Sequence, residues 1–300
     1  MLDLRSALRN DRKCKALTGL TVSEFEALIH DFSWNYSEYE NKKKPKRLRR
    51  LGGGRSSKLK TIEEKLFYIL LYMKVYPTFD VASQWVGFHR SNACEWVIVL
   101  LPILEQTLGR KLVLPQRKIS SAEEFLKLFP EVKDVFGDAT ERRINRPRNI
   151  KRQRKTYSGK KKINGRKNVI LTDSKRRILV LTQTKSARRH DKRLADKQNL
   201  FQVIPESVAV WVDTGFQGIQ KYHNNTLIPK KNTKKNPLTE SDKLENSLIS
   251  SFRVVVEHAI GGIKRYNSLK YAYRNKTNYM DDKLALVSAG LWNYHLSFST

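Results

Sequence analysis

Three charged side chains recur at helical intervals in residues 252–266. Arg253 and Glu257 are one helical turn apart, and Lys264 lies two turns beyond Glu257, so a helix would place all three on one face. A carboxylate held between two cations could bind a metal ion while the cations bind phosphate. The alternative is an amphipathic helix with ordinary salt bridges. Only further acidic residues at suitable places elsewhere would favour the metal site.

Two adjacent glycines, Gly261 and Gly262, follow Glu257 within the same predicted helix. Each costs roughly 1 kcal/mol relative to alanine inside a helix. Something must offset that cost. Close approach of another backbone, or of a nucleic-acid strand, would do so.

Two aspartates stand beside predicted strands upstream. Residues 132–138 read as a strand that carries Asp138, and residues 208–212 read as a buried strand that ends in Asp213. Aspartate is disfavoured inside strands, which makes Asp138 a functional candidate, although a turn aspartate is the alternative. An acid at the carboxyl end of a buried strand, before a glycine-bearing turn, lies where α/β sheets place active sites.

These positions give three candidate metal ligands, Asp138, Asp213 and Glu257. Carboxylates suit hard cations such as Mg²⁺. Two such ions can activate a nucleophile and stabilise the leaving oxygen in phosphoryl transfer. Three grouped acids would repel one another unless cations occupied the site. The chemistry predicted from these residues is therefore metal-dependent phosphoryl transfer.

The elements around the three acids follow the order strand, hairpin, helix, strand, strand, helix. The hairpin is expected from the apolar runs 168–171 and 177–181, and Asp191 is a candidate N-cap for the helix after it. A further strand is expected at 226–229. The closing segment 280–298 is expected to form a helix packed on the sheet.

The N-terminal third predicts helices instead of strands. Apolar residues repeat at helical spacing from Thr61 to Lys74, and a short helix at 79–85 is followed by a turn at Gly87 and a capped helix from Ser91. A short helix, a glycine turn and a second helix match helix-turn-helix spacing, which many helical bundles also imitate.

The charge balance points to a polyanionic partner. The chain has 59 basic and 29 acidic residues and a formal charge of +30. The tracts 41–60 and 142–167 contain no acidic residue, so they either track phosphates or are solvated charge runs. Nucleic acid is the first candidate partner. An anionic membrane is second, but no long apolar run or signal peptide is present. Cys14 and Cys94 lack metal-ligand spacing and favour a reducing cytoplasm.

Residues about 50–296 resemble bacterial insertion-sequence transposases of the DDE superfamily. The resemblance rests on seven landmarks in order: Leu51-Gly52-Gly53-Gly54-Arg55, the helix-turn-helix, Gly137-Asp138-Ala139-Thr140-Glu141, Ser158-Gly159-Lys160-Lys161-Lys162, His190-Asp191, Asp213-Thr214-Gly215-Phe216-Gln217-Gly218, and Arg253, Glu257 and Lys264. Two positions depart from the pattern: Ser250 stands where relatives often carry tyrosine, and Asn164 stands where many carry histidine.

The resemblance implies a fold and a set of site residues. It implies a helical DNA-binding region with a helix-turn-helix (residues 1–112, the motif at about 61–103) and a ribonuclease-H-like mixed-sheet catalytic domain (113–300). Asp138, Asp213 and Glu257 would be catalytic and would bind two Mg²⁺ ions, with Mn²⁺ as a substitute and no other cofactor. The residues expected to contact DNA are Arg253 and Lys264 near the scissile phosphate, and Arg55, Arg90, Asn92, Lys160, Lys161 and Lys162 elsewhere.

The implied function is DNA transposition. The protein would bind the terminal inverted repeats of its element, cut the strand and join the freed 3′-hydroxyl to target DNA. Its partners would be double-stranded DNA and a second copy of itself in a synaptic complex, with no membrane, in the nucleoid of a bacterial cytoplasm. Two alternatives stay open: a catalytically inert DNA-binding regulator, and a metal-dependent endonuclease that does not transpose.

Overall fold

The computed structural model describes residues 4–43, 57–234, 236–277 and 279–299 of the chain. The chain forms two compact units. The helical unit comprises Met1–Leu114, Ile263–Tyr271 and Asn275–Thr300, and the sheet unit comprises Pro115–Gly262 and Ala272–Arg274. None of the helices in the described ranges is long and apolar enough to cross a membrane.

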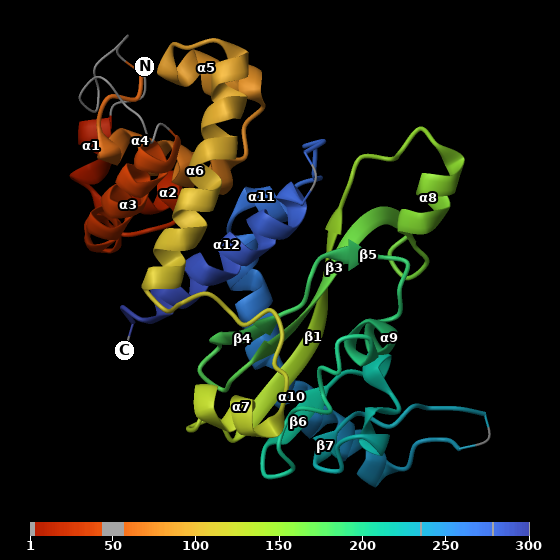
Figure 1. The fold of residues 1–300 in the computed structure, drawn as a ribbon. Helices are drawn as coiled ribbons and strands as arrows, with labels where there is room; N and C mark the ends of the chain where they lie inside the picture. The colour runs from red at the N-terminus through yellow and green to blue at the C-terminus, as the bar shows by residue number, and fades with distance from the viewer. Residues whose placement is uncertain (1–3, 44–56, 235, 278, 300) are drawn as a thin grey trace. The chain divides into compact units, whose positions relative to one another are not determined.

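The helical unit gathers helices from both ends of the chain (Figure 1). Its elements are α1 (Leu4–Leu8), α2 (Asp11–Thr18), α3 (Val22–Lys43), α4 (Ile62–Val75), α5 (Phe79–Val86), α6 (Arg90–Arg110), α11 (Asn267–Lys270) and α12 (Met280–Leu296). The prediction of a closing helix is confirmed, but its expected packing on the sheet is wrong. Instead α12 packs against α6. The expected division into 1–112 and 113–300 therefore differs from the compact units, because α12 buries apolar side chains such as Leu284 and Leu291 within the helical unit.

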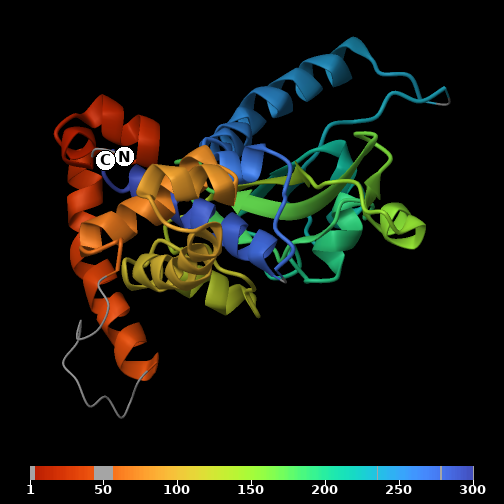
Figure 2. The same ribbon diagram turned by 90° about the horizontal axis from the view of Figure 1, so that it is seen from above.

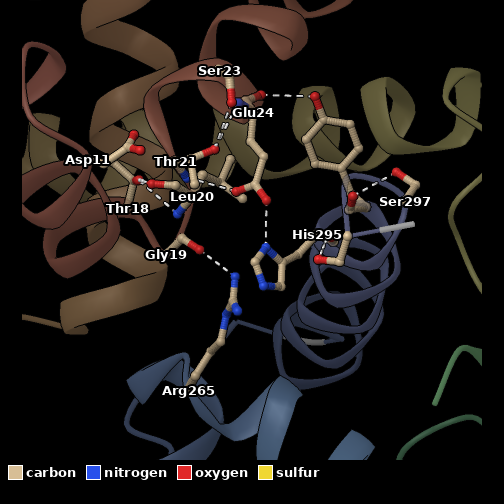
Figure 3. Close-up of polar contacts among 12 residues, drawn as sticks. Asp11, Thr18, Gly19, Leu20, Thr21, Ser23, Glu24, Arg265, His295 and Ser297 are labelled. Atoms are coloured by element: carbon tan, nitrogen blue, oxygen red, sulfur yellow. Dashed lines mark hydrogen bonds and ion pairs between the residues drawn. The ribbon is translucent and has the colours of Figure 1, made fainter. Parts of the chain in front are cut away.

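Polar contacts tie α12 to the start of α3 (Figure 3). Nδ1 of His295 lies 2.5 Å from Oε1 of Glu24, and the hydroxyl of Tyr294 donates to the Glu24 carbonyl at 2.9 Å. Arg265 donates to the carbonyl oxygen of Gly19. Burial raises the pKa of the Glu24 carboxyl, but hydrogen bonds from His295 and from the Thr21 backbone outweigh it, so that the pKa is lowered.

Helices α4 to α6 begin and end where their capping residues indicate. Thr61 and Glu64 form a capping box at the start of α4. Thr78 caps α5, and Gly87, with a φ of 75°, ends it in the left-handed conformation that glycine adopts without strain. Helix α6 begins at Arg90 with His89 as its N-cap, two residues before Ser91, which the sequence indicated as the cap. The expected short helix, turn and long helix are thus present.

The sheet unit is built on one mixed seven-stranded sheet. Its strands are β1 (Asp134–Arg143), β2 (Tyr157–Ser158), β3 (Ile163–Thr172), β4 (Ile178–Leu181), β5 (Lys185–Ser186), β6 (Ala209–Val212) and β7 (Thr226–Leu227). The strand order is β2-β3-β1-β6-β7, and β4 and β5 also pair with β3. Strands β1, β3 and β4 are antiparallel, as the expected hairpin requires, whereas β1, β6 and β7 are parallel.

Helices cover both faces of this sheet. The helices of this unit are α7 (Ala122–Leu128), α8 (Ile150–Thr156), α9 (Asp191–Asp196) and α10 (Glu240–Lys264), of which α8 has no buried residue, with two 3₁₀ turns, η1 (Thr214–Phe216) and η2 (Ile219–Lys221). One face packs Val135, Val169 and Val212 into the core with Phe125 and Leu194 of α7 and α9. On the other face Phe136 stacks on Trp211, whose ring centre lies 4.9 Å from that of Phe252 on α10. Figure 2 shows α10 as one long helix beside the strands.

Several elements of the sheet unit differ from the sequence prediction. Strand β1 continues past Asp138 as far as Arg143, because β3 pairs with it up to Arg143↔Gly165. That pairing overrides the low strand propensity of the charged residues. Helix α10 begins at Glu240, well before residue 252. Helix α9 begins at Asp191 with His190 as its N-cap, so Asp191 is not the cap that the sequence indicated.

Candidate active site

Asp138 and Asp213 are positioned by two adjacent parallel strands. The last residue pair between β1 and β6 is Gly137↔Val212, and each aspartate is the residue that follows. Neighbouring strands lie about 4.8 Å apart, so this register brings the two aspartates to the same level of the sheet. The structure therefore brings together the two predicted strand acids.

Asp138 lies on the face of the sheet that α10 covers. Side chains alternate along a strand, so Asp138 shares the face of Phe136, which stacks on Trp211 beneath α10. Its Oδ1 accepts a hydrogen bond from the Ala139 backbone at 2.7 Å. Burial raises the pKa of the Asp138 carboxyl, the Asp213 charge raises it further, and Arg253 of α10 opposes the rise. A cation in this site would relieve the unfavourable charge.

Asp213 forms the turn that leaves β6. Its Oδ1 accepts from the Gly215 backbone at 2.9 Å, which caps η1. A β-carbon on Gly215 would lie 2.8 Å from Oδ1 of Asp213 and 3.0 Å from Oδ2 of Asp191. Gly215 therefore leaves room for two carboxylates side by side. Lys160 approaches Asp213 only to 4.0 Å and is 72% exposed, so it neutralises little of this charge.

A buried ion pair network supports Asp191. Nζ of Lys167 lies 2.7 Å from Oδ1 of Asp191 and 3.0 Å from Oε1 of Glu141. The side chains of Lys167 and Glu141 are 6% and 4% exposed. Burial lowers the pKa of Lys167, but the two carboxylates outweigh it and raise the pKa. Across the described ranges, Oε2 of Glu141 has no hydrogen-bond partner.

Sequence reasoning missed the role of Lys167 and Glu141. They face each other in the β1–β3 register, a relationship that depends on strand pairing and not on spacing along the chain. The only signals in the sequence were an acid one residue past Thr140 and a lysine that follows Arg166 at the end of the basic tract. Neither residue can be recognised as half of an ion pair until the register of β1 and β3 is known.

Glu257 is not gathered with the two aspartates. It lies on α10, one turn past Arg253, and its side chain is exposed. Within the part of the chain that the structure describes, no three His, Cys, Asp or Glu side chains are grouped closely enough to hold one metal ion. Arg253 is partly buried, and its Nε has no hydrogen-bond partner among those residues. The structure thus brings together two of the three expected ligands.

The other predicted DNA contacts are spread over both units. Arg90 and Asn92 are exposed in the first turn of α6, and Arg90 lies 3.4 Å from Asp80. Lys264 is the last residue of α10 and is partly buried in the helical unit. Three lysines are exposed in the turn between β2 and β3: Lys160, Lys161 and Lys162. Arg55 lies outside the described residues.

Comparison with known proteins places this arrangement in a family. Residues 137–293, which include both strand aspartates and Glu257, match the family described as DDE superfamily endonuclease. The chain is also 30% identical over 287 residues to a probable transposase for insertion sequence element IS702 from Microchaete diplosiphon, covering 95% of each protein. No solved structure matches. The chain belongs to the insertion-sequence transposases of the DDE superfamily.

Proposed function

We propose that the protein cuts DNA at the ends of its own element and joins the freed 3′-hydroxyl to target DNA. The observation that carries the proposal is the placement of Asp138 and Asp213 beside each other after the Gly137↔Val212 pair. Oxygen donors on adjacent strand ends suit a hard divalent cation, and DDE endonucleases generally use divalent metal ions.

Asp138, Asp213 and Glu257 are the proposed ligands of two Mg²⁺ ions, which Mn²⁺ can replace. Bound ions would supply an activated water and stabilise the leaving oxygen. Mg²⁺ usually takes only one or two protein carboxylates, with phosphate oxygens and water as its other ligands. The two aspartates could therefore hold the first ion, and Glu257 would be supplied by α10, which packs on the face that carries Asp138. Arg253 binds the phosphate beside the cut.

The strand order supports a ribonuclease-H-like catalytic domain. Antiparallel strands β4, β3 and β1 are followed by β6 and β7, both parallel to β1, and α9 separates the two groups along the chain. One proposed ligand stands on the first strand and one at the end of β6. The mixed sheet is therefore suited to hold acids near one level.

The helical unit is the proposed reader of the element's terminal inverted repeats. Helix α5, the Gly87 turn and α6 form the proposed helix-turn-helix, and exposed Arg90 and Asn92 lie in the turn of α6 that would meet base edges. The further proposed phosphate contacts are Arg55, Lys264 and Lys160 to Lys162. Pairing of two element ends requires self-association, and DNA as substrate places the protein at the nucleoid.

The decisive experiment compares three full-length proteins on supercoiled plasmid DNA with Mg²⁺ or Mn²⁺. They are the wild type, Asp213→Asn and, as a matched control, Asp196→Asn, whose acid pairs with Lys192 on the surface of α9. Metal-dependent nicking that is lost only in Asp213→Asn supports the site. Adding pre-cut element ends then tests joining: products linked to the plasmid support transposition, whereas nicking without joining would support the endonuclease alternative.

One observation keeps the inert regulator as a second candidate: Glu257 is exposed, and the described residues contain no group of three His, Cys, Asp or Glu side chains that could hold a metal ion. Glu257→Gln separates the two cases. Loss of nicking assigns Glu257 to the site. Specific binding to element ends without nicking by the wild type, even with both ends supplied, would favour the regulator.

A further inference from the structure

A pocket of about 650 Å³ opens in the sheet unit away from the aspartates. It lies where β1 ends and β3 begins, and α8, β2 and the segment after β5 complete its wall. Figure 1 shows α8 beyond this end of the two long strands. The volume falls within the range of about 300–1,000 Å³ that is typical of small-ligand sites.

The wall of the pocket is strongly basic. Five of its side chains are cations, and all five are exposed: Arg143, Arg146, Arg154, Lys162 and Arg188. No acidic residue lines the pocket, and none of the five forms an ion pair with an acid in the described chain. Unneutralised charges of one sign around a concave surface repel one another and attract an anion. The pocket is therefore built for a ligand that carries phosphate.

The pocket also offers a surface for a flat ring. Tyr157 of β2 is 42% exposed on the wall, and Ile144 and Ile163 add apolar surface. Contact with phosphate alone needs no such surface. Stacking on tyrosine is the usual way in which proteins hold an unpaired base.

Two amides in the wall are oriented by hydrogen bonds inside the protein. Oδ1 of Asn164 accepts from Oγ1 of Thr156 at 2.9 Å, and Oε1 of Gln153 accepts from Nε of Arg146 at 3.0 Å. Each bond uses the amide oxygen. The NH₂ groups are left to donate to acceptors such as the carbonyl oxygens and ring nitrogens of a base.

We propose that this pocket binds one unpaired nucleotide of the DNA substrate, with its base on Tyr157 and its phosphates on the surrounding arginines. The proposal rests on the proposed function, because it takes DNA to be the substrate. Arg143 belongs to β1, the strand that carries Asp138. Five residues of strand span roughly 17 Å, so the nucleotide is held at a fixed distance of several nucleotides from the proposed cutting site.

The test uses the full-length protein and two labelled DNA probes: a blunt duplex, and the same duplex with a single-stranded overhang that contains 2-aminopurine. The variants are Tyr157→Ala, Tyr157→Phe, which keeps the ring, and Tyr271→Ala, a matched control that removes a tyrosine with 49% exposure from the helical unit. Equal melting temperatures show that each variant is folded. Fluorescence anisotropy gives affinity, and 2-aminopurine emission reports stacking of the unpaired base.

We expect Tyr157→Ala to bind the overhang probe roughly 5- to 150-fold more weakly, the loss that corresponds to one base–aromatic stack. Its affinity for the blunt duplex stays within about twofold of wild type, because duplex phosphates do not use the ring. Wild type and Tyr157→Phe quench 2-aminopurine, whereas Tyr157→Ala does not.

Two kinds of result would overturn the proposal. Only the second would also overturn the proposed function. Equal losses on both probes, or quenching that persists in Tyr157→Ala, would reduce the pocket to a backbone contact and leave the proposed function standing. Failure of the wild type to bind either probe would remove the proposed function together with the pocket.

Discussion

The ammonium group of Lys167 lies 2.7 Å from the carboxylate of Asp191, and the two side chains are only 6% and 11% exposed. Asp191 in turn faces Asp213 across Gly215. Lys167 thus connects the buried acid Glu141 to the edge of the candidate active site. Its loss should lower the stability of the fold and release Asp191 from its position.

Lys167→Met is expected to destabilise the protein by about 3–5 kcal/mol, because it leaves the buried carboxylates of Glu141 and Asp191 without a cation. Urea unfolding measures the change. The matched control is Lys192→Met, which removes the i,i+4 pair with Asp196 and should cost less than about 1 kcal/mol because that pair is more exposed. Similar losses in the two variants would contradict a special role for Lys167.

Asp138→Asn is expected to keep or raise the melting temperature at pH 7 while abolishing stabilisation by Mg²⁺. Burial raises the pKa of this carboxyl above its unfolded value, so above the unfolded pKa the ionised form opposes folding and a neutral amide removes that penalty. An ion that binds the proposed site would stabilise the wild type by about 2.7 kcal/mol at 100 times its Kd. Thermal unfolding with and without Mg²⁺ measures both effects. A Mg²⁺ shift that survives in Asp138→Asn would argue against this ligand.

Gly261→Ala separates folding from DNA binding on α10. A β-carbon at Gly261 would meet nothing within 4 Å, so alanine should stabilise the helix by about 0.5–1 kcal/mol. If a nucleic-acid strand approaches here, the same variant binds duplex DNA more weakly. Gly290→Ala is the contrasting control, because its β-carbon would lie 2.7 Å from a Leu114 methyl group, and it should destabilise. Unchanged DNA affinity in the stabilised Gly261→Ala would exclude close approach of DNA at this turn.

Glu24→Gln should make the melting temperature depend less on pH below about pH 4.5. The pKa of Glu24 is lowered in the fold, so its contribution is present above the unfolded pKa, near 4.3, and is lost as pH falls through the folded value. Melting temperatures between about pH 3 and pH 7 measure this. The wild type should lose more stability than Glu24→Gln below about pH 4.5. Parallel curves would show that the contact with His295 does not contribute.

Local signals in the sequence predicted the strand end that positions Asp213 and two of the helices. The run before Asp213 and the glycine turn after it predicted a strand end, and the structure has β6 end at Val212. The apolar spacing from Thr61 to Lys74 and the short helix expected at 79–85 correspond to α4 and α5. These features depend on neighbours within a few residues, which is why they could be predicted.

The features that were missed depend on distant segments. Strand β1 runs on to Arg143 because β3 pairs with it, and Lys167 meets Glu141 through the same register. The apolar pattern of residues 280–298 predicted a helix with a buried face. It could not show that this face packs against α6. The spacing of Arg253 and Glu257 indicated a helix, yet spacing alone could not show which turn of α10 is buried against the sheet.

The helical unit is built from both ends of the chain, so its two parts are synthesised at different times during translation. Helix α6 emerges with Leu104 and Leu108 ready for burial, but α12, against which it packs, is made only after the whole sheet unit has been translated. At about 5–20 residues per second, that interval is roughly 7–30 s. The nascent chain therefore exposes an unfinished apolar surface on α6 until α12 has been made, and the helical unit is completed last.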